Sequence, residues 1–197
     1  MVQASSCVGA LRVCLPTRDG RAEVHTVATL LTALPAALGR PVLIHLGQAG
    51  NIPRARNQAQ REAEAHAPDQ DPVWVLWVDS DILLEADQAP AVARYVERAE
   101  VDGVGWVAHY RQADGRSVLS LEGGRHAPIL AAEEAEALPD WHPIAMAGLG
   151  LAYLPMPRGY LWHADDMGED WHLWQDTGMV ARFAAGIRVR HHRLAYL

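Results

Sequence analysis

The sequence predicts an α/β fold in which an open, mostly parallel (mixed) sheet is flanked by helices. Over residues 11–78, segments typical of strands alternate with segments typical of helices, and this alternation predicts right-handed crossovers between parallel strands. Residues 73–78 are apolar without interruption, which is typical of a strand buried on both faces of a parallel sheet. The length of 197 residues is that of one domain, so we expect residues 1–197 to form a single compact unit.

The predicted elements follow one another in a regular order. We expect strands at residues 11–15, 41–46, 73–78, 103–108 and 187–189, with 117–121 as the hairpin partner of 103–108 and a further apolar stretch at 144–154. We expect helices at residues 24–34, 51–66, 89–100 and 169–185, and an irregular excursion or short helix within 122–142. Asn51 is a suitable N-cap with Pro53 in the first turn. The apolar stripe of the first helix consists of Val24, Val27, Leu30, Leu31 and Leu34.

The composition restricts the classes of partner. The formal net charge is −7, and every fixed positive charge is an Arg because the sequence has no Lys. This balance argues against nucleic-acid binding, although Arg suits bidentate capture of phosphate or carboxylate. No apolar stretch reaches the roughly 20 residues that cross a bilayer, and the first residues lack a signal-peptide pattern. We therefore expect a cytoplasmic protein without a transmembrane segment, with Cys7 and Cys14 reduced; a homo-oligomer is compatible with the sequence.

Two carboxylates follow the third predicted strand directly. Asp79, Ser80 and Asp81 come after residues 73–78, and ligands of open α/β sheets bind at the carboxyl ends of strands. Two neighbouring carboxylates repel each other unless a cation lies between them, and hard oxygen ligands fit Mg²⁺ or Mn²⁺. The other interpretation is a turn or helix cap, since Asp-Ser-Asp is also good turn chemistry.

A second acidic segment opens the last predicted helix. Asp166 as N-cap with Glu169 three residues later satisfies the capping-box pattern. Asp170 is not needed for that cap, and a carboxylate beside a helix N-terminus could accept a proton from a sugar hydroxyl as a general base. The sequence thus leaves both a capping and a catalytic hypothesis open.

Other candidate residues lie at the start of a helix, in a glycine loop and at the end of the last strand. Arg54, Arg56 and Asn57 begin the helix at 51–66 and could hold a diphosphate, or form an exposed polar face. Gly148 and Gly150 could let the backbone approach a sugar closely. His191 or His192 could supply an imidazole to the same cation as the two Asp residues, and the pattern does not decide which because neighbouring strand residues face opposite ways.

Taken together, these motifs resemble the glycosyltransferases of the GT-A fold, particularly their broad family-2-like group. Pro16, Thr17, Arg18 and Asp19 are similar to that family's nucleotide-binding start, and residues 54–57 resemble its Arg-Asn helix. Residues 79–81 match the Asp-x-Asp metal motif, Gly148-Leu149-Gly150 the glycine loop, residues 168–170 with Glu169 and Asp170 the x-Glu-Asp motif, and His191 or His192 the C-terminal metal histidine. A weaker similarity, carried by residues 74–82 after Arg56 and Asn57, links the chain to fungal mannan-polymerase subunits, which are thought to retain configuration.

The resemblance implies a single Rossmann-like domain and a metal-dependent glycosyltransferase. It implies a nucleoside-diphosphate sugar as donor, Mn²⁺ or Mg²⁺ held by Asp79, Asp81 and a histidine, and a saccharide or small-molecule hydroxyl as acceptor. Asp170 would be the general base of an inverting reaction. Residues 1–110 would form the nucleotide-binding half and residues 111–197 the acceptor and metal half. Apart from the resemblance, residues 111–142 are expected to be an acceptor-side lid, because this segment is long, weakly patterned and close in chain order to the glycine loop.

Two further functions stay open at this stage. A nucleotidyltransferase shares the α/β layout and metal-bound phosphates, but it normally has a glycine-rich loop after its first strand, where this sequence offers only Gly20. A non-catalytic domain that binds nucleotide sugars or carbohydrates would keep the fold without turnover. An α/β domain whose acidic turns are fortuitous is the remaining alternative.

Overall fold

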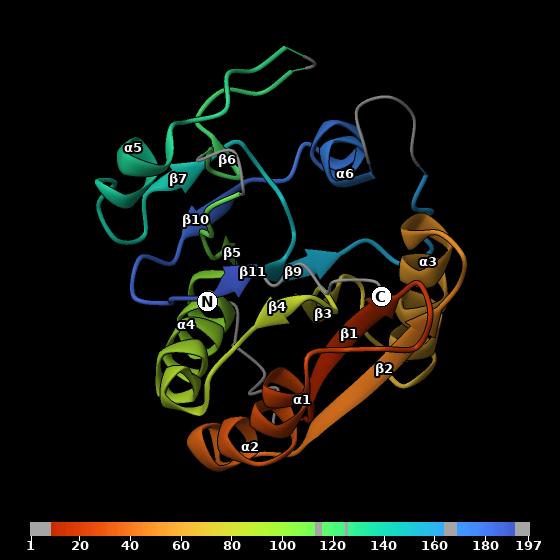
Figure 1. The fold of residues 1–197 in the computed structure, drawn as a ribbon. Coiled ribbons are helices and arrows are strands. Elements are labelled where there is room, and N and C mark those ends of the chain that lie inside the picture. The colour runs from red at the N-terminus through yellow and green to blue at the C-terminus, as the bar shows by residue number, and fades with distance from the viewer. Residues whose placement is uncertain (1–8, 113–115, 125, 164–168, 192–197) are drawn as a thin grey trace, which may run out of the picture.

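The computed structural model describes residues 9–112, 116–124, 126–163 and 169–191, and a central sheet organises them (Figure 1). The sheet has seven strands in the order β2-β1-β3-β9-β5-β10-β7. Their bounds are β1 Leu11–Thr17, β2 Val42–Gln48, β3 Val73–Val78, β5 Gly105–Val107, β7 Pro143–Ile144, β9 Leu151–Met156 and β10 Ala181–Phe183.

The direction of the strands confirms the predicted fold class. β1 pairs in parallel with both β2 and β3, and β10 pairs in parallel with β5. β9 runs antiparallel between β3 and β5, and β7 runs antiparallel beside β10 at the edge. The sheet is therefore mixed but mostly parallel, because β2, β1, β3, β5 and β10 share one direction.

Helices cover both faces of this sheet (Figure 1). α1 Val24–Leu31, α2 Ala33–Leu38 and α4 Ala89–Asp102 pack against one face, together with the short 3-10 helix η1 Ala86–Gln88, which contacts α1, α2 and α4. α3 Ile52–Ala65, α5 Ala132–Glu136 and α6 Glu169–Thr177 contribute to the core on the other face. Alternate residues of β3 enter the two cores, with Leu76 on the first side and Trp77 on the second. The uninterrupted apolar run of β3 is thus explained by burial on both faces.

Two small sheets lie beside the central one. β4 Ile82–Leu83 pairs antiparallel with β11 Arg190–His191, and β6 Leu119–Ser120 pairs antiparallel with β8 Met146–Ala147. Because Ile82 is opposite His191 in this register, the last described residues return to the carboxyl end of β3. None of the helices in the described part of the chain has both the length and the apolar character needed to cross a membrane.

The helix predicted at 24–34 is not continuous in the structure. Thr32 has non-helical backbone angles (φ −123°, ψ −64°), so α1 ends at Leu31 and α2 begins at Ala33. Leu30 and Leu34 are buried as the apolar stripe predicts, but Val24 and Leu31 are exposed. The break redirects the chain after Leu31. Val24 and Leu31 are seven residues apart within α1, so they share one face of this helix, and that face is exposed.

Three predictions about the second half are also wrong. Residues 117–121 do not pair with β5, because β9 and β10 already occupy both of its edges; β6 pairs with β8 instead. The predicted helix at 169–185 ends at Thr177, where Gly178 follows with φ +61°, and residues 181–183 form β10 inside the central sheet. The strand predicted at 187–189 lies at 190–191. A short, mostly apolar segment such as 179–184 fits a helix or a strand equally well by pattern, so tertiary pairing decides.

We expect Gly47→Ala to lower the free energy of unfolding by about 2–3 kcal/mol or more, because it overpacks a contact between helix and strand. A Cβ atom at Gly47 in β2 would overlap the backbone carbonyl of Ala55 in α3 and lie 3.2 Å from the Cβ of Ala59. Urea unfolding measures the effect. Gly50→Ala is the matched control, because a Cβ there has nothing within 4 Å, and its change should stay within about 0.5 kcal/mol. Equal unfolding midpoints for the two variants would contradict the close packing of α3 on β2.

Candidate functional site

The site forms at the carboxyl end of β3, where the backbone fixes two carboxylates. Asp79 follows β3 directly, and its N–H donates to the carbonyl of Gly150 at 2.9 Å. Asp81 precedes β4, and pairing of β4 with β11 brings His191 beside it. The Oδ2 of Asp81 lies 3.0 Å from the Nε2 of His191. The predicted proximity of Asp81 and His191 is therefore present, whereas His192 lies outside the described residues.

Arg56 connects the two acidic segments that the sequence singles out. Its Nη2 lies 3.0 Å from Oδ1 of Asp79 and 3.1 Å from Oδ1 of Asp170. The side chain is 1% exposed, and its guanidinium carbon lies 5.4 Å from the ring centroid of Trp77 and 4.9 Å from that of Trp162. Stacking on two aromatic faces fixes the planar cation and compensates for its removal from water. Arg56 therefore bridges two carboxylates that would otherwise repel each other.

Asp170 lies in the first turn of α6 and is held from two sides. Besides the ion pair with Arg56, its Oδ2 accepts a hydrogen bond from the N–H of Leu149 at 3.0 Å. The glycine loop at 148–150 thus contacts the carboxylate that the sequence singles out as a base. Glu169 is the first residue of α6, and Gly168 and Asp166 lie outside the described residues.

Tyr110 belongs to the site, although the motifs do not single it out. Its ring stacks on that of His191 with centroids 5.4 Å apart and planes 10° apart. Burial and, after it, the nearby carboxylates of Asp79, Asp170 and Asp81 raise the pKa of Tyr110 well above its usual value, so the phenol stays protonated. A Cβ at Gly150 would overlap the Tyr110 ring, which explains why a glycine stands there. The position of Tyr110 in the sequence could have identified it, because Tyr110 follows β5 and so lies at the same edge of the sheet as Asp79.

Several residues predicted to hold a diphosphate have other contacts. The side-chain amide of Asn57 donates to the carbonyl of Trp162 at 2.8 Å and accepts from its N–H at 2.9 Å, so Asn57 ties α3 to the segment before α6. The side chain of Arg54 is exposed, and its N–H donates to the N-cap Asn51 at 3.0 Å. Of the three helix residues predicted to hold a diphosphate, only Arg56 contacts the carboxylates of the site in the described part of the chain.

The predicted nucleotide-binding start lies at the end of β1. Pro16 and Thr17 are buried within β1, and the hydroxyl of Thr17 accepts from the N–H of Gly20 at 2.8 Å. Arg18 and Asp19 are exposed directly after the strand. The carbonyl of Ser80 accepts from the N–H of Glu23 at 2.8 Å, which joins this turn to the acidic turn after β3. The two predicted segments therefore lie at the same edge of the sheet.

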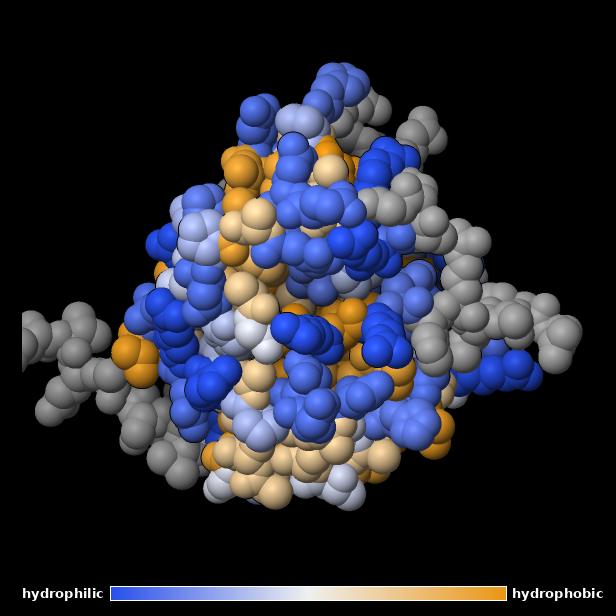
Figure 2. All heavy atoms as spheres, turned by 60° about the vertical axis from the view of Figure 1, so that its left-hand side comes forward, coloured by the Kyte–Doolittle hydropathy of each residue, from blue (hydrophilic) through white to orange (hydrophobic). Residues whose placement is uncertain are grey.

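A cavity of about 560 Å³ opens beside His191. Its lining comprises His109, Tyr110, Arg111, Glu136, Phe183, Ala185 and residues 187–191. In Figure 2, which turns the α4 and α5 side forward, hydrophilic side chains cover much of the face, with hydrophobic areas between them. Part of the predicted acceptor-side segment 111–142 thus lines a cavity next to the acidic site.

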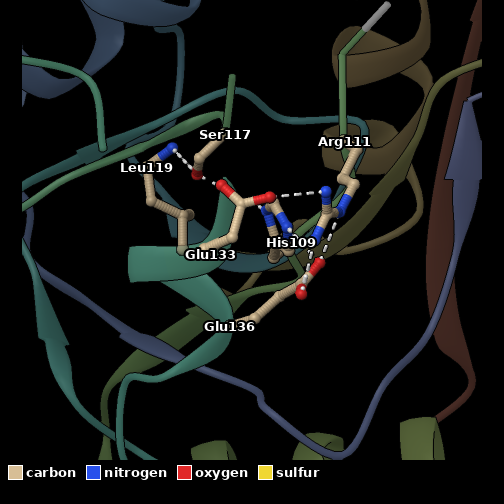
Figure 3. Close-up of polar contacts among 6 residues, drawn as sticks. All are labelled: His109, Arg111, Ser117, Leu119, Glu133 and Glu136. Atoms are coloured by element: carbon tan, nitrogen blue, oxygen red, sulfur yellow. Dashed lines mark hydrogen bonds and ion pairs between the residues drawn. The ribbon is translucent and has the colours of Figure 1, made fainter. Parts of the chain in front are cut away.

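One wall of this cavity is fastened by an Arg–carboxylate cluster (Figure 3). Arg111 donates to both carboxylate oxygens of Glu136 at 2.7 and 2.8 Å and to Glu133 at 2.8 Å, which ties α5 to the segment after β5. The Nε2 of His109 lies 3.6 Å from Oε1 of Glu136. Burial lowers the pKa of His109 despite the opposing effect of Glu136. Ser117 accepts from the N–H of Leu119 at 2.9 Å and stabilises the start of β6.

The chemistry of the donor set fits a divalent cation at Asp81 and His191. A carboxylate oxygen and an imidazole nitrogen 3.0 Å apart are both ligands that Mn²⁺ accepts. Asp79 differs, because its Oδ1 is paired with Arg56. The structure therefore supplies two adjacent donors for a metal and a third carboxylate that is shared with a fixed cation.

Comparison with known proteins adds one finding. No protein-family model matches the chain, and no curated protein matches it in sequence. Among solved structures, the chain is similar to a glycosyltransferase involved in the glycosylation of the major capsid of PBCV-1, with 9% sequence identity, a TM-score of 0.46, and coverage of 93% of this chain and 94% of that one. At this identity and TM-score, the likeness assigns neither a family nor an activity. Fold and site together define an α/β protein with an acidic site, braced by Arg56, at the carboxyl ends of its parallel strands.

Proposed function

We propose that this protein is a glycosyltransferase that moves a sugar from a nucleoside-diphosphate sugar to a hydroxyl acceptor. The observation that carries the proposal is the convergence of Arg56, Asp79 and Asp170 into one ion-paired group beside the Asp81–His191 pair. These residues come from α3, the turn after β3, α6 and β11, so the tertiary fold assembles them. A fixed cation, a metal-compatible donor pair and a separate carboxylate match the needs of a reaction that releases a diphosphate.

Each residue has a defined role in this proposal. Asp81 and His191, with Asp79, would hold Mn²⁺ or Mg²⁺, whose charge stabilises a departing diphosphate. The acceptor oxygen attacks the anomeric carbon of the donor, and Asp170 takes the hydroxyl proton as general base. The bond between the anomeric carbon and the diphosphate oxygen breaks, and the nucleoside diphosphate leaves with the electron pair. Attack opposite the leaving group inverts the configuration of the anomeric carbon.

The contacts of Asp170 support its role as the base. Arg56 and the N–H of Leu149 hold one oxygen each, so the carboxylate has one orientation. A base held in a fixed direction loses little freedom when the acceptor binds. Tyr110, which stays protonated beside the three carboxylates, supplies a neutral hydroxyl donor at the same place.

The test is a thermal-shift screen with UDP, GDP, CDP and dTDP, each with and without Mn²⁺. A ligand that binds only the native state raises the melting temperature, by about 5–10 °C when its concentration is about 100 times its Kd. We expect a Mn²⁺-dependent shift for one nucleotide, its loss in Asp81→Ala, and its persistence in the control Asp87→Ala, whose side chain is exposed on η1. No shift with any nucleotide, or an unchanged shift in Asp81→Ala, would overturn the proposal.

A second measurement separates the proposal from the two other functions. Incubation of the nucleotide sugar with protein and Mn²⁺ should release free sugar slowly, because transferases pass some donor to water. A nucleotide shift without release would indicate a binding domain. Release of pyrophosphate from a nucleoside triphosphate and a sugar phosphate would indicate a nucleotidyltransferase.

A further inference from the structure

A second cluster of metal-donor side chains lies away from Asp81, between α6 and the segment before it. It consists of His163, His172 and Asp176, whose donor atoms all lie within 4.8 Å of one another. His172 and Asp176 are one helical turn apart on α6, so their side chains share a face of the helix. His163 lies outside α6 and directly follows Trp162 in the chain. Two elements thus contribute ligands to one point.

The side chains of the cluster are in direct contact with one another. The Nε2 of His163 lies 3.1 Å from Oδ2 of Asp176, and the rings of His163 and His172 have centroids 4.3 Å apart. Imidazole nitrogen suits Zn²⁺, and two imidazoles with one carboxylate form a common three-residue set that leaves the fourth position to water. Shifts of about 1 Å would bring three donors to the roughly 2.0–2.2 Å of zinc–ligand bonds.

The surroundings hold these donors in place. The hydroxyl of Tyr160 donates to Oδ2 of Asp176 at 3.1 Å, the kind of outer contact that orients a metal-binding carboxylate. The residue before His163 is fixed on both sides of its backbone by Asn57. His172 is half-buried, whereas His163 and Asp176 are exposed, so an ion can enter from the solvent.

We propose that His163, His172 and Asp176 bind one Zn²⁺ ion, which fastens α6 to the segment 157–163. Asn57 already ties that segment to α3, the helix that carries Arg56. The ion would complete a connection between α3 and α6, the two helices that contribute Arg56 and Asp170. The site is separate from the Asp81–His191 pair and does not depend on the proposed transferase activity.

Calorimetric titration of the metal-free chain with Zn²⁺ tests the proposal. Because Zn²⁺ can also bind at the Asp81–His191 pair, the decisive result is a binding step that persists in Asp81→Ala, the variant that removes this other donor pair. Loss of an outer partner typically weakens metal binding by about 10–100-fold, so we expect Tyr160→Phe to weaken this step by about 10-fold. Loss of a ligand should cost more, so His163→Ala and Asp176→Asn should weaken the step by more than about 100-fold. His25→Ala, an exposed histidine on α1, is the matched control and should bind as the wild type does.

Titration with Co²⁺ gives a second readout. The visible absorption of bound Co²⁺ reports whether nitrogen atoms coordinate the ion and whether it has few ligands in total. The band should appear in the wild type, Asp81→Ala and His25→Ala and be lost in His163→Ala. His163 is exposed, so its variant should keep the wild-type circular dichroism. Absence of a zinc step in Asp81→Ala, or a step in that background that both His163→Ala and Asp176→Asn leave unchanged, would overturn the proposal; neither result bears on nucleotide binding.

Discussion

Arg56→Met is expected to lower the free energy of unfolding by about 3 kcal/mol, the lower end of the cost of removing one partner from a buried ion pair. Met keeps much of the aliphatic volume between the rings of Trp77 and Trp162 but removes the charge. Asp79 and Asp170, whose side chains are 23% and 22% exposed, would then face each other without the cation between them. Urea unfolding at neutral pH measures the loss.

Matched variants identify the cause of this loss. Arg54→Met makes the same change two residues earlier in α3 at an exposed position, and should change stability by no more than about 0.5 kcal/mol. Combining Arg56→Met with Asp79→Asn and Asp170→Asn should restore part of the stability, because the stranded charges are removed as well. If Arg56→Met unfolds at the same urea concentration as Arg54→Met, the bridge does not stabilise the fold.

Asp170→Asn is expected to reduce the rate constant of sugar transfer by about 10²- to 10⁴-fold, the usual contribution of a general base. Asn is isosteric and retains one oxygen that can accept from the N–H of Leu149, whereas the ion pair with Arg56 is lost. Nucleotide affinity should change little, because the proposal places the metal and diphosphate at the other carboxylates. Steady-state kinetics with the donor found in the thermal-shift screen would show the loss in kcat rather than KM.

A matched control variant accompanies this measurement. Asp87→Asn, exposed on η1, should leave kcat unchanged. Wild-type kcat in Asp170→Asn would contradict the role of base.

Patterns that depend on burial and local geometry were predictable from the sequence. The apolar run at 73–78 forms β3, and Asn51 caps α3 by accepting from the N–H of Arg54 at 3.0 Å. Both features follow from interactions within a few residues or from the simple need to exclude water. The position of Asp79 and Asp81 after a buried strand was predictable for the same reason.

The later elements were predicted less well because distant partners decide them. Residues 181–183 pair in parallel with β5 and antiparallel with β7, and those pairings override a pattern that also fits a helix. Residues 117–121 are excluded from β5 because β9 and β10 occupy its edges. No local propensity encodes which edge of a strand is already paired.

The sequence by itself determined the alternating α/β order, the buried central strand and the chemical types available for a site: paired carboxylates, arginines and histidines. Only the tertiary structure decided how they combine. It placed Arg56 between Asp79 and Asp170, turned Asn57 toward the backbone of Trp162, and brought Tyr110 against His191. Each of these contacts joins residues many positions apart, and their energies depend on burial and on the direction of a side chain, which are set when the helices pack on the sheet.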